Sequence, residues 1–154
     1  MIIIHYVIFV LLFVAAVYYV YPEKGLPTNI VITNIVIDKS SHNMKVFSNG
    51  ILVKTYSVSI GRGVYGIHDS DWDNITPTGT FIVDGKFAGS RYHKAITISY
   101  GNEIELHGIK NGLEIFGKFH RWIDWTRGCI AVTNSEIDEL YQAVHVGTAI
   151  TITD

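Results

Sequence analysis

The first 21 residues constrain the fold most, because they include a long segment without a charged side chain. Residues 2–21 read IIIHYVIFVLLFVAAVYYVY, and the 12 Lys and Arg and the 14 Asp and Glu residues all follow them. About 20 apolar residues cross a bilayer core as a helix, and closing tyrosines suit the membrane interface. We expect residues 1–21 to be a transmembrane signal anchor rather than a core element. The bulky residues after Ala15 and Ala16 favour an uncleaved anchor over a removed signal peptide.

The rest of the sequence predicts one mostly β domain. Residues 22–29 contain Gly25 and Pro27 and predict a linker, so the domain covers residues 30–154. Short runs rich in Val, Ile and Thr favour strands. The net charge of −2 and the lack of a basic run exclude nucleic acid as an expected partner. The single cysteine cannot form a disulfide within the chain, so cysteine usage does not indicate the compartment.

Alternating apolar residues predict the strands. Residues 29–40 predict one strand, and residues 44–61 predict two strands joined at Asn49-Gly50, a dipeptide typical of type I′ hairpin turns. Shorter strands are expected at residues 80–85, 94–100, 102–108, 129–132 and 148–153.

One helix is expected in the C-terminal half of the chain. Thr133 and Glu136 have the spacing of a capping box, and Gly147 lies where it would follow the helix end. An apolar face at helical spacing is predicted to pack on the sheet; it consists of Ile137, Leu140, Tyr141 and Val144.

The segment from residue 61 to residue 79 contains four glycines and lacks an apolar period, so it predicts a long exposed loop. Three alternating aspartates in it suggest a calcium loop. Asn74 stands where such a loop needs glycine, and Thr80 stands where it needs glutamate. We therefore expect a solvated loop.

A metal site is a second alternative. His68, His107, His120 and Cys129 are conceivable zinc ligands, but none of them forms a closely spaced pair of the kind that makes zinc motifs specific. We expect neither a metal nor a cofactor.

Cys129 is the candidate nucleophile. A free thiol titrates near pH 8.5 and needs a neighbouring base or cation to react at neutral pH. His107 can supply the base, Arg127 adds positive potential, and Gly128 omits a Cβ where a substrate carbonyl would approach backbone N–H groups. A lone cysteine is otherwise a small core residue, but the preceding Arg-Gly favours the nucleophile. We expect a thiolate and an imidazolium that titrate as a unit.

The motifs of this chain resemble those of the L,D-transpeptidase (YkuD) catalytic domain family. LHG at 106–108 and WTRGCIAVTN at 125–134 are similar to the family's HG ahead of a [ST]-x-G-C core. TPTGTF at 76–81 is similar to its TP-x-G-x-F stretch. The last helix and strand of the chain also resemble those of the family, so the resemblance covers about residues 30–153.

The resemblance implies an L,D-transpeptidase-like β-sandwich with one helix in its C-terminal half. It implies that Cys129 attacks the amide between an L and a D centre of a peptidoglycan stem peptide, and that an acceptor amine or water resolves the acyl-thioester. His107 would be the base, and the Gly108 carbonyl would orient its ring. Backbone N–H groups around Gly128 and Cys129 would form the oxyanion hole. Arg127 stands where many relatives carry histidine and would meet a stem-peptide carboxylate.

The distance between His107 and Cys129 along the chain exceeds that of compact members. It predicts that residues 110–124 form an expanded flap, with His120, Trp122 and Trp125 shaping the substrate channel. The motif DWTRGCIAVTN at 124–134 also resembles that of enzymes that detach a lipoprotein from peptidoglycan, in which water replaces the acceptor amine.

The sequence therefore leaves transpeptidase and hydrolase open, with a silent wall-binding module and a zinc amidase as further alternatives. The positive-inside rule does not orient the anchor. Function places the protein in a bacterial inner or cytoplasmic membrane as a single-pass protein, with its catalytic domain on the cell-wall side.

Overall fold

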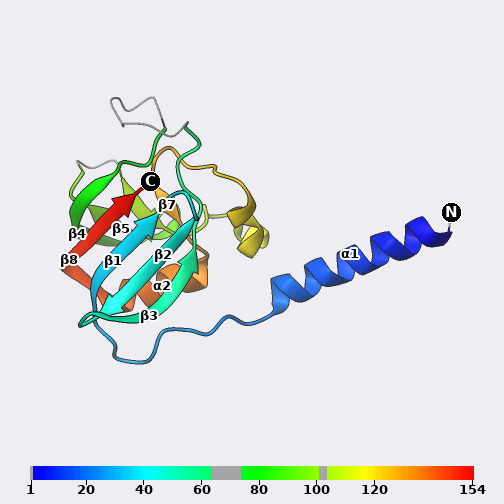
Figure 1. Ribbon diagram of the computed structural model, residues 1–154, viewed down its shortest axis with the longest axis horizontal. Helices are drawn as coiled ribbons and strands as arrows, with labels where there is room; N and C mark the ends of the chain where they lie inside the picture. Colours follow the sequence, from blue (N-terminus) through cyan, green and yellow to red (C-terminus); the bar gives the residue numbers. More distant parts are fainter. Residues whose placement is uncertain (1, 64–73, 101–103) are drawn as a thin grey trace.

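The computed structural model describes residues 2–63, 74–100 and 104–154. Within these ranges a long N-terminal helix precedes a mostly β domain (Figure 1). The elements are α1 (Ile2–Val20), β1 (Ile32–Asp38), β2 (Asn43–Ser48), β3 (Ile51–Ser57), β4 (Gly79–Ser90), β5 (His93–Ile98), β6 (Glu105–His107), the 3₁₀ segment η1 (Glu114–Trp122), β7 (Ile130–Ala131), α2 (Asn134–Ala143) and β8 (Val144–Thr153).

The strands form one curled sheet in the order β3-β2-β1-β8-β4-β5-β6-β7. β1 runs parallel to β8, and β4 pairs antiparallel with both β8 and β5. The register shifts between Val83 and Gly85, where β4 passes from one half of the sheet to the other. Such irregularities bend a strand. The expected sandwich-like fold is confirmed, and its two layers are halves of one sheet.

The predicted hairpin is present between β2 and β3. Ser48 pairs with Ile51, and the turn residues Asn49 and Gly50 have φ values of 50° and 80°. Positive φ at both central residues is the requirement of a type I′ turn.

The predicted helix is α2, which packs on β5 and β8. The Thr133 side chain accepts the Glu136 backbone N–H, and the Glu136 carboxylate accepts the Thr133 N–H at 2.9 Å. The expectation for Gly147 is wrong: Val144 ends α2 by extending directly into β8, so Gly147 lies inside that strand. The buried core of the domain includes Ile35, Val46, Tyr56, Val83, Ile96, Leu106, Ile137, Leu140 and Ile150.

The helix α1 is long and apolar enough to cross a membrane, by length and composition, and none of the span in residues 3–20 is buried in the protein. Figure 1 shows it projecting away from the domain, with η1 near its C-terminal end. A span of this kind fits a membrane anchor or a signal sequence equally.

The expected flap contains η1, which breaks at Gly117, where φ is 44°. The aspartates considered for calcium, at positions 69, 71 and 73, and His68 lie outside the described residues.

Candidate active site

The strands β6 and β7 place His107 and Cys129 on the same face of the sheet. They run parallel, with His107 opposite Ala131. Partners in register project to the same face, and so do residues two apart on one strand, so Cys129, just before β7, shares the face of His107. Both residues line a pocket of about 370 Å³.

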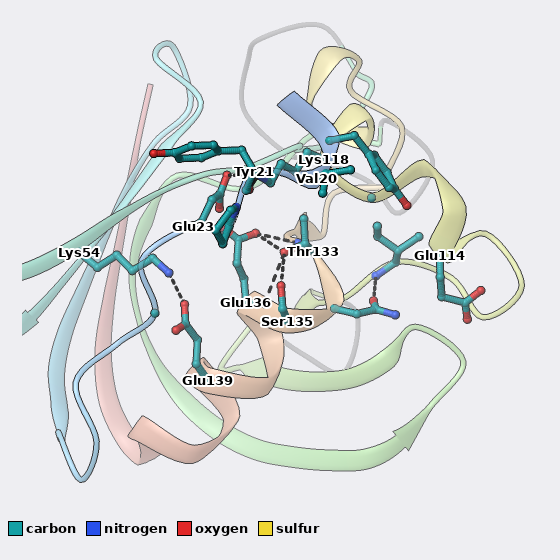
Figure 2. Close-up of a pocket in the computed structure, with 16 residues that line it drawn as sticks. Val20, Tyr21, Glu23, Lys54, Glu114, Lys118, Thr133, Ser135, Glu136 and Glu139 are labelled. Carbon is teal, nitrogen blue, oxygen red and sulfur yellow. Dashed lines mark hydrogen bonds and ion pairs between the residues drawn. The ribbon is translucent and has the colours of Figure 1, made fainter. Parts of the chain in front are cut away.

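The wall of this pocket is basic and aromatic. Its lining residues are Arg62, Arg91, Tyr92, His107, Lys110, Trp125, Thr126, Arg127 and Cys129. A larger pocket of about 410 Å³ lies between the end of α1, the linker, η1 and α2, and contains neither Cys129 nor His107 (Figure 2). The smaller pocket is the candidate active site, because of these two pockets it is the one that combines a thiol with an imidazole.

His107 is held in one orientation by its neighbours. Its Nδ1 lies 2.6 Å from the Gly108 carbonyl oxygen. The ring stacks on Tyr92 with centroids 4.2 Å apart and meets the Trp125 ring edge-on at 5.7 Å. A carbonyl only accepts hydrogen bonds, so Nδ1 carries the proton. The neutral ring therefore has a basic Nε2.

Gly108 fits its place because of close backbone packing. Its N–H donates to the carbonyls of Tyr92 at 3.1 Å and Lys94 at 3.2 Å. A Cβ on Gly108 would lie 2.7 Å from Asn134 Oδ1 and 2.9 Å from the Tyr92 oxygen. Asn134 in turn accepts the N–H of Ile109 at 2.8 Å. The Gly108 carbonyl is thus fixed between β5 and α2.

The turn before Cys129 is closed by Thr126. Its hydroxyl donates to the Cys129 carbonyl at 2.6 Å and accepts the Gly128 N–H at 3.3 Å. Gly128 has φ of 109°, and a Cβ there would lie 2.9 Å from the Ile75 oxygen. The positive φ and this close contact therefore already require glycine at position 128. The approach of a substrate is not the only reason for it. The Gly128 N–H, which we expected to face a substrate carbonyl, is bonded to Thr126.

Burial favours the neutral forms of both reacting groups. It lowers the pKa of His107 to about 4, although the bond to Gly108 opposes this shift. Burial also raises the pKa of Cys129 to about 11; the contact with the Glu105 backbone opposes that shift and the Glu105 carboxylate adds to it. Both pKa shifts favour the thiol and the imidazole in the resting pair. This direction is opposite to that of the thiolate and imidazolium expected from the sequence.

The other side chains predicted for the site differ in where they lie. Arg127 and Trp125 line the pocket with Cys129. His120 is buried beside it, where its Nδ1 lies 3.2 Å from Ser59 Oγ, and burial lowers its pKa to about 4. Trp122 is 67% exposed. It packs against Tyr18 of α1 and does not line the pocket.

Four pocket residues were missed by the sequence reasoning: Arg62, Arg91, Tyr92 and Lys110. Tyr92 sits in the tight connection between β4 and β5, where Ser90 pairs with His93. It is brought to His107 by the pairing of β5 with β6. No local motif marks such residues, because their proximity depends on tertiary structure.

The described parts of the chain do not contain a group of side chains that would support the zinc alternative. Among them, no three His, Cys, Asp or Glu side chains come together in a way that could hold a metal ion.

A family model of the L,D-transpeptidase catalytic domain (YkuD) matches residues 33–152. The chain belongs to the L,D-transpeptidase family. It is 28% identical over 138 residues to the Bacillus subtilis (strain 168) protein YqjB, whose name assigns it to the L,D-transpeptidases; the match covers 78% of this chain and 70% of that protein.

Solved L,D-transpeptidase structures share the fold of this family member. An L,D-transpeptidase from Mycobacterium tuberculosis H37Rv has a TM-score of 0.58 at 17% identity, over 78% of this chain and 57% of that one. L,D-transpeptidase 3 from M. tuberculosis, in complex with a faropenem-derived adduct, has a TM-score of 0.57 at 16% identity, over 78% of this chain and 59% of that one. The chain thus spans less than two thirds of these neighbours.

Proposed function

We propose that this L,D-transpeptidase family member is a cysteine-dependent peptidoglycan L,D-transpeptidase that acts through an acyl-thioester on Cys129. One observation carries the proposal: His107 at the end of β6 and Cys129 just before the parallel strand β7 line one pocket, and the Gly108 carbonyl orients the imidazole.

The neutral resting pair determines how the reaction begins. His107 Nε2 takes the thiol proton while the Cys129 sulfur attacks the carbonyl of the L residue. The tetrahedral intermediate expels the amine of the D residue, which takes the proton from Nε2. An acceptor amine then attacks the thioester, its proton passes to His107, and the thiolate leaving group takes that proton back.

The oxyanion that forms at the attacked carbonyl needs hydrogen-bond donors. Backbone N–H groups of Gly128 and Cys129 lie in the turn beside the sulfur. The Gly128 N–H donates to Thr126 over a long 3.3 Å. Transferring this donor to the oxyanion exchanges a weak bond for a charge-assisted one, so the donor acts mainly in the transition state.

The charge of the pocket fits an anionic stem peptide. Arg62, Arg91, Lys110 and Arg127 line it, and its described lining includes no Asp or Glu. Guanidinium groups bind carboxylates through paired hydrogen bonds. Tyr92 and Trp125 add flat apolar surface for the peptide backbone.

The location follows from the same proposal. Residues 1–21 anchor the chain in the membrane, residues 22–29 link it to the domain, and residues 30–154 act on the cell-wall side. The length and apolar character of α1 support the anchor.

The test is intact mass spectrometry of the full chain in nanodiscs with a tetrapeptide muropeptide, with and without an acceptor amine. We expect an acyl adduct on Cys129, absent in Cys129→Ala, and a cross-linked product when the amine is present. Hydrolysis product alone would make the protein a peptidase of the same mechanism.

A second arm uses faropenem, since a related transpeptidase carries an adduct derived from it. Failure of Cys129 to acquire mass from either reagent would leave a wall-binding module. Activity that survives in Cys129→Ser but is lost on chelation would make the protein a zinc amidase.

A further inference from the structure

Within the flap, residues 113–123 present large apolar side chains to the solvent. Ile115 is 78% exposed, and Trp122 and Ile123 are each 67% exposed. Leu113 and Phe116 are exposed as well. Apolar side chains concentrated in one short segment indicate a surface that another phase or molecule covers.

This flap packs on the C-terminal end of α1. Tyr18 contacts Phe119 and Trp122, with ring centroids 6.0 Å and 6.3 Å apart. Tyr19 stacks on Phe119 at 5.6 Å. Figure 1 shows the same arrangement, with η1 beside the helix end and the rest of the domain beyond it. The exposed flap side chains are therefore continuous with the exposed apolar surface of α1.

Polar contacts hold the flap to the C-terminal end of α1 and so fix its position along the helix axis. Lys118 Nζ donates to the carbonyls of Tyr18, at 3.2 Å, and Tyr21, and so caps the last turn of α1. Arg121 donates to both oxygens of Glu23, at 2.8 Å and 3.0 Å, and to Glu136 of α2 at 2.6 Å. In Figure 2, Tyr21, Glu23 and Lys118 lie together over the first turn of α2.

We infer that the flap is a membrane-docking surface, whose apolar side chains enter the bilayer interface where α1 leaves it. The inference rests on the proposed anchor role of residues 1–21. A helix of 19 residues is about 28 Å long, close to the thickness of the hydrocarbon core. Tyr18 therefore lies at the interface, and so does Trp122, which contacts it.

The chemistry of the flap favours lipid over a protein partner. Amphipathic segments that lie in the interface combine aromatic and aliphatic residues with basic ones. In the flap, Lys118 and Arg121 stand between such residues in sequence, and their side chains are largely buried against the end of α1 and the linker, so the face left for lipid is the apolar one. A protein partner on this surface would also have to fit around a helix that is itself in lipid.

The docking surface is close along the chain to the candidate active site. Trp125 follows the flap along the chain and lines the pocket of Cys129. Docking thus holds one wall of the pocket at a fixed distance from the bilayer, which suits a substrate that is presented near the membrane.

The test measures the depth of single probes in the full chain. Cys129→Ala removes the only native thiol, and Ile115→Cys, Ile123→Cys or Ile51→Cys adds one for an NBD label. Ile51, 72% exposed, follows the turn between β2 and β3, on the side of the domain away from α1 (Figure 1). Each protein is placed in nanodiscs with and without lipids that carry a nitroxide near the headgroup.

We expect the labels at 115 and 123 to be blue-shifted and quenched at least about twofold more than the label at 51. Equal quenching at all three positions would overturn docking. A blue shift without lipid quenching, rising with protein per disc, would assign the surface to a second copy of the chain and also overturn it. Release of the chain by alkaline carbonate would overturn the anchor and docking together. None of these readouts depends on catalysis. A failure of the proposed reaction can therefore be distinguished from a failure of membrane docking.

Discussion

His107 Nδ1 lies 2.6 Å from the carbonyl oxygen of Gly108, the next residue in the chain. The imidazole that we propose as the base is therefore oriented by its own backbone, and no carboxylate is needed for the tautomer. That carbonyl is fixed because the Gly108 N–H bonds to β5 and its Cα faces Asn134. The geometry of the base thus depends on the absence of a side chain at position 108.

The Gly108→Ala variant tests this dependence. Its Cβ would meet Asn134 Oδ1 at 2.7 Å, so the backbone must shift and carry the carbonyl away from His107. We expect a loss of about 1–3 kcal/mol in unfolding free energy. Displacement of a catalytic group by about 1 Å can reduce the rate about 100-fold. Thermal unfolding and the rate of faropenem acylation measure the two effects.

Gly89→Ala is the matched control, because a Cβ there has no atom within 4 Å. It should leave both stability and rate close to those of the parent chain. An equal rate for Gly108→Ala and the parent would show that the carbonyl does not position the base.

Tyr92 is expected to hold the other side of the imidazole. In Tyr92→Leu the stack at 4.2 Å is lost, which removes about 0.5–1.5 kcal/mol of aromatic interaction and admits water to the ring. We expect slower acylation and an acid limb of the pH–rate profile that moves to higher pH, since burial is what lowers the pKa of His107. Tyr92→Phe keeps the ring and should keep the profile. An unmoved acid limb in Tyr92→Leu would remove this role.

The pH dependence of the reaction should be bell-shaped and broad. Attack needs a neutral His107, whose pKa is lowered to about 4, and a protonated Cys129, whose pKa is raised to about 11. Acylation by muropeptide should therefore be level near pH 7, whereas alkylation by iodoacetamide, which needs the thiolate, should still be rising above pH 9. A plateau of alkylation below pH 7 that disappears in His107→Ala would show an ion pair instead.

Two buried histidines predict a loss of stability in acid. The pKa values of His107 and His120 fall from 6.5 to about 4 on folding, so the unfolded chain binds more protons between those values. Their contribution is complete above pH 6.5 and is lost as the pH falls towards 4. For each residue this amounts to about 3 kcal/mol. Urea unfolding at pH 7.0 and 4.5 measures it.

His120→Gln should reduce this loss of stability in acid by about half, because glutamine does not titrate while His107 still does. His145→Gln changes an exposed histidine and should leave this loss as it is. Identical slopes in the two variants would mean that His120 is not held neutral by the fold.

Local signals explain which parts of the fold and site could be predicted from sequence. The hairpin at Asn49-Gly50 and the start of α2 at Thr133 depend on neighbouring residues alone. The 3₁₀ form of η1 lacks such a signal, because it is held by contacts with α1 and the linker and bends at Gly117. The prediction that Gly147 follows the helix end was wrong because neighbouring residues alone do not distinguish a glycine after a helix from a glycine inside a strand.

The site divides in the same way. Cys129 and His107 lie in recognisable motifs, whereas Tyr92 comes to His107 only through strand pairing. The neutral state of the pair also depends on burial, which a list of residues does not contain. Trp122 was expected at the substrate channel, but it packs on Tyr18 because the linker brings α1 back to the flap.

Glu23 should connect the linker to the flap. Its bidentate contact with Arg121 lowers the pKa of Glu23 to about 2, so the ion pair is complete above pH 4.5 and is lost only as the pH falls towards 2. In Glu23→Gln the Arg121 side chain keeps Glu136 as its carboxylate partner, and the linker loses its charged contact with the flap. We expect faster amide hydrogen exchange in residues 114–122 at pH 7, with exchange in β1 and β8 unchanged. Lys24→Gln is the control, because it alters the adjacent exposed side chain. If exchange in η1 is no faster in Glu23→Gln than in this control, the ion pair does not hold the flap.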